Sequence, residues 1–232
     1  MTVSDLSQSA QTYLKAIWLL QEWSEKPVTA TVIAERVGLR LSTVSEALRK
    51  LTEQGLVHHA RYGSVTLTEA GQAHAVAMVR RHRLIESFLV RTLHYGWDEV
   101  HEEAERLEHV VSDRLVERID ALLGHPVRDP HGDPIPAADG ATHRPDAKQL
   151  SQTTPGESVR VERISDADSA MLQYFAEQGV VVDAELEVLE RAPYSDSTVV
   201  RVAGGADDPM SLGTRAASAI WVSVRSAPVP TG

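Results

Sequence analysis

Two short amphipathic helices followed at once by a hairpin are the feature that most restricts the fold of this chain. Thr29 is suited to cap the first helix, and Gly38 stands where a left-handed residue commonly ends one. The second helix is the stretch RLSTVSEALRKLTEQG, in which Thr43 and Glu46 predict a Thr-x-x-Glu capping box and Gly55 ends the helix. Two helices so closely spaced predict a helix-turn-helix.

The hairpin follows in the stretch LVHHARYGSVTLT. It reads as two strands around a Tyr62-Gly63 turn, because apolar Val65 and Leu67 alternate with threonines. Apolar residues at helical spacing over residues 6–23 predict a further helix before the helix-turn-helix. Together these elements predict a winged helix, a fold that can place its second helix in the major groove of DNA.

The second helix of this motif leaves a polar face directed away from its apolar stripe. Its first turn would meet base edges, and its basic residues would meet phosphates. The alternative is an ordinary solvated helix in a helical hairpin. The candidate DNA contacts, including one residue before the helix and one in the wing, are Arg40, Ser42, Thr43, Ser45, Glu46, Arg49, Lys50 and Arg61.

The net charge of −10 argues at first against a nucleic-acid partner, because phosphate contacts need lysine and arginine. The distribution of charge along the chain weakens this argument against a nucleic-acid partner. Residues 1–70 carry 7 basic and 7 acidic groups, residues 71–145 carry 9 and 13, and residues 146–232 carry 7 and 13. The N-terminal third is therefore the only part that is not acidic on balance.

The chain contains no cysteine, which excludes disulfides, thiolate nucleophiles and cysteine-based metal sites. It also has no apolar run of the roughly 18 residues needed to span a bilayer. The N-terminal stretch MTVSDLSQSA lacks the basic and apolar parts of a signal peptide. We therefore expect a cytoplasmic protein.

Beyond the winged helix, the pattern predicts two long helices, over residues 69–93 and 98–123, with a short break near Tyr95-Gly96. The two would be antiparallel, so that their faces can converge. Residues 124–156 hold six prolines and four glycines, which predict an extended, semi-rigid connection.

The C-terminal part contains the β-rich runs SVRVERI, ELEVLER, STVVRVA and AIWVSVR, with a brief helical stretch near residues 168–178. A small β-barrel would account for them. The expected fold class is mostly α with β. The expected domains are a winged helix at 1–70, a helical dimerisation and metal-binding hairpin at 71–145, and a barrel domain at 146–232.

The stretch EVHEEAERLEH, residues 99–109, gathers five carboxylates and two histidines. As a helix it places His101, Glu105, Glu108 and His109 on one face, separate from an apolar stripe. Glu105 and Glu108 gain no attraction from a cation at helical spacing, so they repel each other. A solvated acidic face is the alternative, but a divalent ion would turn the repulsion into attraction.

The preceding helix carries RRHRLIE, in which His82 and Glu86 are four residues apart and share a face. Two ligand-competent faces on adjoining helices strengthen the metal hypothesis. Carboxylates and imidazoles without sulfur favour Mn²⁺ or Fe²⁺, although Zn²⁺ can also bind such a set.

The ordered succession VRRHRLIESFL, EVHEEAERLEHVVSD and DPHGDPIP, between a winged helix and a small β-barrel, resembles the metal-dependent repressors of the diphtheria toxin repressor family. The resemblance covers the whole chain and is strongest to the manganese-responsive actinobacterial branch. It implies an SH3-like (FeoA-type) barrel and a homodimer that binds a palindromic operator when loaded with metal. It also implies repression of metal-uptake genes in response to Mn²⁺, with Fe²⁺ as the alternative and Zn²⁺ or Co²⁺ binding in vitro.

The resemblance further implies two metal sites. The first, ancillary site would take His82, Glu86 and His101 from the helices. An acidic residue of the barrel would complete it, for which Asp168 is the best match, with Met171 at the position of a neighbouring ligand.

The second, regulatory site would take Glu105, Glu108, His109 and one residue of the first helix. Iron-responsive members usually have cysteine in place of Glu105, so the carboxylate favours manganese. The first-helix ligand is usually Met or Asp, but Thr12 aligns there, and Lys15 stands where other manganese sensors add a Glu. Either Thr12, a carbonyl or water completes the site, or the site is weaker than in relatives.

Two rival functions remain at this point. A metal-dependent hydrolase would also use carboxylates and histidines, but the sequence supplies no separate nucleophile or general base, and the chain is not expected to be an enzyme. A winged-helix regulator of an organic ligand would leave the carboxylates structural. Equilibrium dialysis against Mn²⁺, Fe²⁺ and Zn²⁺ distinguishes these alternatives, because a hydrolase binds metal and turns over substrate, whereas a regulator of an organic ligand binds none of these ions tightly.

Overall fold

The computed structural model describes residues 3–60, 63–204 and 208–225. The chain divides into two compact units. The first comprises Met1–Ile85, Glu103–Val127 and Ile135–Thr142, and the second comprises Glu86–Glu102, Arg128–Pro134 and His143–Gly232. Among the described residues, no helix combines the length and the apolar character that crossing a membrane requires.

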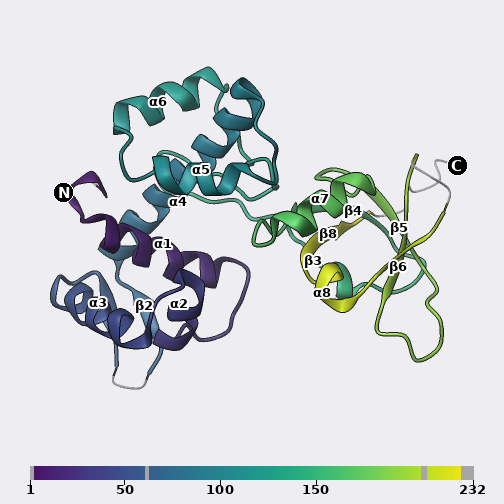
Figure 1. The fold of residues 1–232 in the computed structure, drawn as a ribbon, viewed down its shortest axis with the longest axis horizontal. Helices are drawn as coiled ribbons and strands as arrows, with labels where there is room; N and C mark the ends of the chain where they lie inside the picture. The colour runs from purple at the N-terminus through teal and green to yellow at the C-terminus, as the bar shows by residue number, and fades with distance from the viewer. Residues whose placement is uncertain (1–2, 61–62, 205–207, 226–232) are drawn as a thin grey trace, which may run out of the picture. The chain divides into compact units, whose positions relative to one another are not determined.

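The first unit begins with a short 3-10 turn, Val3–Asp5, and then forms the expected winged helix (Figure 1). Its elements are α1 (Gln8–Glu22), α2 (Ala30–Val37), α3 (Leu41–Glu53), β1 (Val57–His59) and β2 (Val65–Leu67). The strands pair antiparallel, with Val57 opposite Leu67. The Thr29 hydroxyl accepts a hydrogen bond from the Val32 amide, and Gly38 ends α2 with a φ of +67°. The cap and the terminal glycine predicted for α2 are therefore present.

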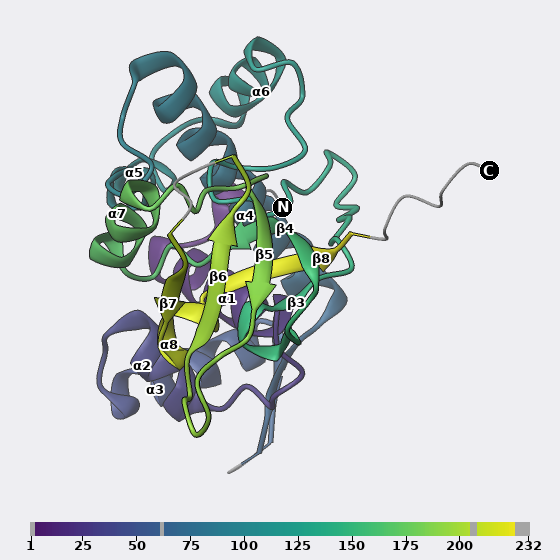
Figure 2. The same ribbon diagram turned by 90° about the vertical axis from the view of Figure 1, so that its right-hand side faces the viewer.

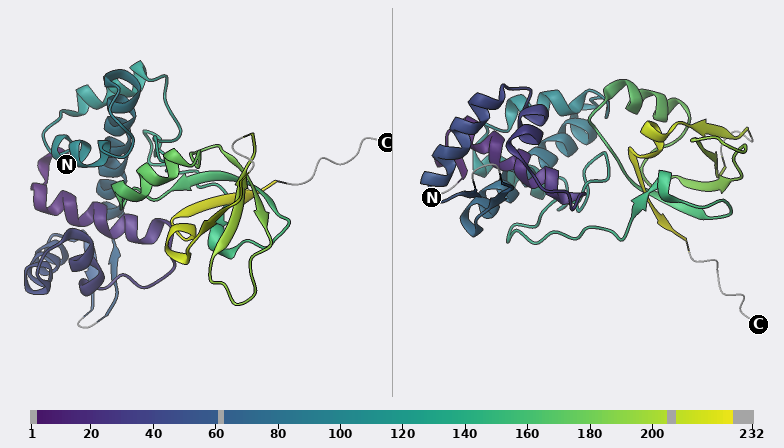
Figure 3. Two further views of the ribbon diagram at one scale, coloured as in Figure 1. Left: turned by 45° about the vertical axis from the view of Figure 1, so that its right-hand side comes forward. Right: turned by 90° about the horizontal axis from the view of Figure 1, so that it is seen from below.

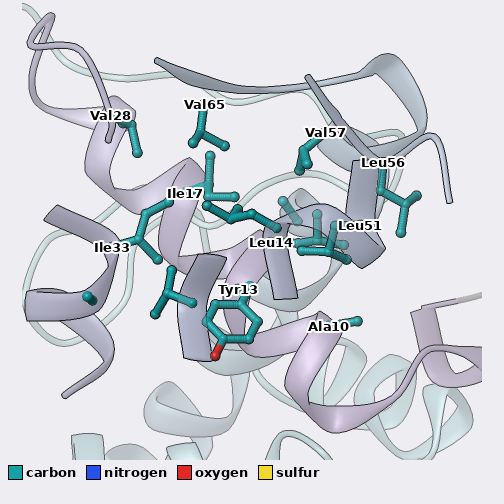
Figure 4. Packing of buried hydrophobic residues seen from close by; sticks show 14 residues of the cluster. Ala10, Tyr13, Leu14, Ile17, Val28, Ile33, Leu51, Leu56, Val57 and Val65 are labelled. Carbon is teal, nitrogen blue, oxygen red and sulfur yellow. The ribbon is translucent and has the colours of Figure 1, made fainter. Parts of the chain in front are cut away.

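The core of this winged helix is built from every one of its elements. Leu14 and Ile17 of α1 meet Ile33 of α2 and the strand residues Val57 and Val65 (Figure 4). Each of these five side chains is at most 1% exposed. Burying an aliphatic side chain stabilises the fold by about 1.5–3 kcal/mol, so α1 is held firmly in this unit.

The expected capping box at the start of α3 is wrong. The helix begins at Leu41, two residues before Thr43, and Arg40 occupies the cap position without a side-chain hydrogen bond. The Arg40 carbonyl instead accepts from the Thr43 and Val44 amides at 3.0 and 3.1 Å. Glu46 therefore lies inside the helix and pairs with Lys50 at 2.9 Å.

Three helices follow the winged helix: α4 (Glu69–Leu93), α5 (Val100–Leu107) and α6 (Asp113–Leu122). The prediction of one continuous helix over 98–123 is wrong, because α5 stops at Leu107. The Ser112 hydroxyl accepts from the Leu115 amide at 3.2 Å and starts a new helix there. Two consecutive β-branched valines precede Ser112, and such residues favour a helix less than straight-chain ones.

Residues 128–134 form a compact turn rather than the expected extended connection. Asp129 Oδ1 accepts hydrogen bonds from the His131 and Asp133 amides, both at 2.9 Å. Gly132 has a φ of +91°, and the His131 carbonyl accepts from the Ile164 amide at 2.9 Å. An aspartate side chain that satisfies the backbone two residues on overrides the extended tendency of the prolines.

The second unit contains a six-stranded antiparallel sheet in the order β3-β8-β4-β5-β6-β7 (Figure 2). The strands are β3 (Lys148–Gln149), β4 (Ser158–Ile164), β5 (Glu185–Leu189), β6 (Thr198–Val202), β7 (Met210–Leu212) and β8 (Ile220–Val224). The four β-rich runs of the sequence correspond to β4, β5, β6 and β8. The two strands that were not expected, β3 and β7, have only two and three residues.

The sheet curves around a core that also receives α7 (Ser169–Glu177) (Figure 3). Phe175 and Leu172 of α7 pack with Val159, Val161 and Leu186 of the strands. A short helix, α8 (Thr214–Ala217), and a 3-10 turn, Leu150–Gln152, complete this unit. This core fixes the end of β4 and the start of α7. The short segment between them, residues 165–168, contains Asp166 and Asp168.

Candidate metal centres and DNA-binding face

The second unit contains a partly buried cluster of one imidazole and two carboxylates. Glu86 comes from α4, His101 from the first turn of α5, and Asp166 from the segment that follows β4. His101 Nδ1 lies 3.2 Å from Glu86 Oε1 and 2.9 Å from Asp166 Oδ2. Glu86 is only 1% exposed, and the ligand atoms of the three residues lie within 4.8 Å of one another. This spacing suits a single ion.

The protonation of this cluster follows from its charges. Burial by itself lowers the pKa of His101, but hydrogen bonds and charge from Asp166 and Glu86 outweigh it and raise the pKa to about 10. Burial favours the neutral form of Asp166, yet His101 holds the pKa of Asp166 well below its usual range. A proton on His101 therefore offsets one of the two carboxylate charges at neutral pH, and a divalent ion would have to displace it.

His131, from the turn over residues 128–134, adds an imidazole to the same unit. Its Nε2 lies 2.6 Å from the Trp97 carbonyl, which only accepts, so Nε2 carries the hydrogen. Its Nδ1 is buried without a hydrogen-bond partner among the described residues, 3.9 Å from Glu86 Oε2. Trp97 stacks on the ring at 5.8 Å. A buried nitrogen left unpaired beside a carboxylate is what a metal ligand requires, so these residues fit a divalent ion.

Neither His131 nor its neighbour Asp129 was expected as a site residue. The ligand atoms of Glu86, Asp129 and His131 nevertheless lie within 4.8 Å of one another. Burial lowers the pKa of His131, but the charges of Asp129 and Glu86 raise it on balance. The available signal was the pair Asp129 and His131 in DPHGDPIP, but the prolines of that stretch pointed to an extended connection instead.

The structure corrects the expectation for the barrel residue. Asp168 caps α7, accepting from the Met171 amide at 3.1 Å, and pairs with Arg215 at 2.7 Å. Met171 packs against the core of the sheet. Asp166, two residues earlier, is the carboxylate beside His101. The cap is a local requirement of the helix, and it takes the aspartate immediately before α7.

A second cluster lies in the first unit. It contains Glu105 of α5, Glu108 just after it, His82 of α4 and Lys15 of α1. Lys15 Nζ donates to Glu105 Oε1 at 2.6 Å and to Glu108 Oε2 at 2.7 Å. His82 Nδ1 lies 2.6 Å from Glu108 Oε2. His82, which is four residues before Glu86 on α4, thus contacts a carboxylate that was expected to belong to the other site.

His109 and Thr12 also lie in this second cluster. His109 Nε2 is 3.3 Å from Thr12 Oγ1 and 3.4 Å from Glu108 Oε1, and its Nδ1 is 2.7 Å from Gln11 Oε1. Burial raises the pKa of Glu108, but hydrogen bonds and charge from His82 and Lys15 lower it by more. The pKa of Glu108 is therefore below its usual value. Burial lowers the pKa of His109. The structure brings together the four expected residues and adds Lys15 and Gln11 to them.

The exposed face of α3 carries the expected DNA contacts. Seven of the eight candidates are exposed: Arg40, Ser42, Thr43, Ser45, Glu46, Arg49 and Lys50. Arg49 pairs with Glu53 at 2.6 Å and Lys50 with Glu46 at 2.9 Å, with all four side chains more than half exposed. Such exposed pairs are screened by solvent and contribute little to stability, so phosphates can replace them at low cost. Arg61 lies outside the described residues.

Three known domain families match successive parts of the chain. Residues 5–65 match the family described as "Iron dependent repressor, N-terminal DNA binding domain". Residues 68–137 match "Iron dependent repressor, metal binding and dimerisation domain". Residues 148–224 match the FeoA domain, which identifies the curved sheet as an SH3-like half-barrel.

Individual relatives agree with these matches. The chain is 32% identical to the "Iron-dependent repressor IdeR" of Mycobacterium leprae over 211 residues, 85% of this chain and 90% of the relative. It is 32% identical to the "Diphtheria toxin repressor" of Corynebacterium efficiens over 197 residues, 81% and 85% of the two chains.

Solved structures give the same result. One titled "Manganese-dependent transcriptional repressor complex with manganese" is 55% identical, with a TM-score of 0.88, and the match covers 93% of this chain and 100% of that one. The manganese regulator SloR is 32% identical with a TM-score of 0.77, over 95% and 100% of the two chains. The chain therefore belongs to the diphtheria toxin repressor family, and it is a metal-dependent, DNA-binding transcriptional repressor rather than an enzyme.

Proposed function

We propose that this repressor responds to Mn²⁺ and, when loaded, binds a palindromic operator as a homodimer to repress metal-uptake genes in the cytoplasm. The observation that carries the proposal is a pair of ligand groups that share Glu86, one with His101 and Asp166 and the other with Asp129 and His131, in which His131 Nδ1 has no hydrogen-bond partner among the described residues. These five residues would hold the ion. When bound, the ion supplies the positive charge that the carboxylates otherwise obtain from the His101 proton.

The donor set and one similar structure together favour manganese. The cluster offers carboxylate oxygens and imidazole nitrogens and no sulfur, a set that suits Mn²⁺ and Fe²⁺. The 55% identical structure is titled as a complex with manganese, which supports the first choice. Fe²⁺ is the second candidate, because the relatives IdeR are named iron-dependent repressors.

Selection of operator fragments from genomic DNA tests the proposal directly. The full-length protein is incubated with fragments in Mn²⁺, in Fe²⁺ under anaerobic conditions, in Zn²⁺, in Co²⁺ and in chelator. We expect palindromic fragments upstream of metal-transport genes to be retained with Mn²⁺ and lost in chelator. Equal recovery with chelator would exclude metal-dependent repression, and stronger retention with Fe²⁺ at equal free concentration would reassign the metal.

We expect Mn²⁺ affinity to fall as the pH falls. With the pKa of His101 raised to about 10, the ion competes with a proton at neutral pH. One displaced proton lowers the affinity by up to roughly 100-fold between about pH 8.5 and about pH 6.5. Titration calorimetry in buffers of different ionisation enthalpy should detect the released proton. Affinity that is constant over this range, with no proton release, would contradict the assigned site.

We expect Arg40→Ala to weaken operator binding in a salt-dependent way. Arg40 is exposed at the start of α3, where it can meet a phosphate. Losing one phosphate contact should reduce the slope of log K against log salt by about 0.9. Fluorescence anisotropy at several salt concentrations measures this slope. Lys26→Ala, which removes an exposed charge between α1 and α2, is the matched control and should leave the slope unchanged.

A further inference from the structure

A buried lysine occupies the centre of the second cluster. Lys15 is only 3% exposed, although lysine is rarely buried so fully unless its charge is paired. Its Nζ lies 2.6 Å from Glu105 Oε1 and 2.7 Å from each oxygen of Glu108. It also lies 3.5 Å from His82 Nδ1. The ammonium group therefore touches ligand atoms from α4, from α5 and from the residue just after α5.

The ligand atoms around Lys15 are the same ones that would bind a metal. One ligand atom each from His82, Glu105 and Glu108 lie within 4.8 Å of one another. An ion placed among these atoms would share their oxygens with the ammonium group at hydrogen-bond distance. Two cations so close repel each other strongly in a buried site, and Glu108 is fully buried. The ammonium group and a divalent ion therefore exclude each other here.

The charge of the cluster leads to the same conclusion. Glu105 and Glu108 carry two negative charges, and Lys15 already offsets one of them. Thr12, the first-helix residue beside His109, has a neutral hydroxyl where a carboxylate would have added a third negative charge. The remaining attraction for a divalent ion is small, and desolvating the ion would not be repaid.

We propose that the Lys15 ammonium group is the resident cation of this cluster and takes the place of a second divalent ion. Lys15 holds α1 against Glu105 and Glu108 without metal. The inference rests on the proposed function, because it assigns the metal response to the other cluster, that of Glu86, His101, Asp166 and His131. Mn²⁺ then binds at that cluster alone.

Lys15 lies on α1, so its ion pairs with Glu105 and Glu108 also affect how the winged helix is held. Its chain neighbour Leu14 and the nearby Ile17 belong to the core that α1 shares with α2 and the wing strands. The Lys15 ion pairs therefore connect that core to the residues at the end of α5. The attachment of α1 at this point is independent of metal.

Counting bound ions tests the inference. Electron paramagnetic resonance of free Mn²⁺ in titrations of the full-length protein gives the number of tight sites per chain. Lys15→Met removes the ammonium group at similar side-chain length, and Lys15→Glu adds a carboxylate. We expect each variant, Lys15→Glu most strongly, to bind about one more Mn²⁺ per chain than the unmodified protein. A role of Lys15 limited to stability would not produce such a gain.

A site count that does not rise in either folded variant would overturn the inference. Circular dichroism and thermal melting establish which variants are folded, and Lys26→Met is the matched control. Should neither Lys15 variant fold, Glu105→Gln is tested in the protein that retains Lys15. An unchanged number of bound Mn²⁺ ions per chain supports the inference, and the loss of one ion overturns it. Failure of the proposed function is distinguishable, because it would appear as operator binding that is the same with Mn²⁺ and with chelator, whatever the ion count.

Discussion

Glu86→Gln should abolish Mn²⁺-dependent operator binding while the protein remains folded. Glu86 is 1% exposed, accepts from His101 at 3.2 Å and lies 3.9 Å from the unpaired nitrogen of His131. The amide has the same size and its oxygen can still accept from His101, so the packing is preserved. The charge and the ligand strength of the carboxylate are lost. We expect Mn²⁺ affinity to fall by more than about 100-fold, the upper end of the loss typical for outer-shell partners of a metal.

Isothermal titration with Mn²⁺ and a gel-shift assay measure the two effects separately. Glu102→Gln is the matched control, because Glu102 is an exposed carboxylate directly after His101. We expect that control to bind Mn²⁺ and operator as the unmodified protein does. A Mn²⁺-dependent band shift that survives in Glu86→Gln would show that the regulatory ion binds elsewhere.

Gly132→Ala should both destabilise the second unit and remove metal binding. Gly132 has a φ of +91°, and a Cβ there would lie 2.0 Å from the carbonyl oxygen of Glu162 in β4. Neither backbone can yield without breaking the hydrogen bond between the His131 carbonyl and the Ile164 amide. We expect the free energy of unfolding to fall by about 3 kcal/mol, because the substitution combines backbone strain with a backbone clash. His131 would move with the turn, so Mn²⁺ affinity should fall as well.

Gly156→Ala isolates the contribution of the dihedral angle. Gly156 has a φ of +90°, but no atom lies within 4 Å of the position that its Cβ would take. This control should cost about 1 kcal/mol and leave Mn²⁺ affinity unchanged. Chemical denaturation and Mn²⁺ titration of both variants provide the comparison. Equal destabilisation of the two would show that the contact with Glu162 is unimportant.

In each of the two clusters a different positive charge offsets the repulsion between two carboxylates. In the second unit, one of the two charges of Glu86 and Asp166 is offset by a proton on His101, which a metal ion can displace. In the first unit, one of the two charges of Glu105 and Glu108 is offset by the covalently attached ammonium group of Lys15. A proton leaves readily, but the ammonium group can depart only if α1 or its side chain moves.

Much of the fold could be predicted from the sequence because it depends on contacts between near neighbours. Thr29 and Gly38 delimit α2, and alternating residues define the wing, as their local hydrogen bonds require. The helical period likewise placed His82 and Glu86 on one face of α4. Local signals failed where two of them competed. The capping motif at Thr43 lost to an earlier helix start, and Ser112 interrupted the expected long helix.

By itself the sequence determined the winged helix, the family resemblance, and the carboxylates and imidazoles available as ligands. Only the tertiary structure decided which of them meet. It placed Asp166 rather than Asp168 beside His101, brought His131 next to Glu86, and set Lys15 between two carboxylates 90 and 93 residues away. The physical reason is range. Caps and helical periods act over about four residues, whereas a buried charge is paired by whichever opposite charge the packing of distant segments brings to it.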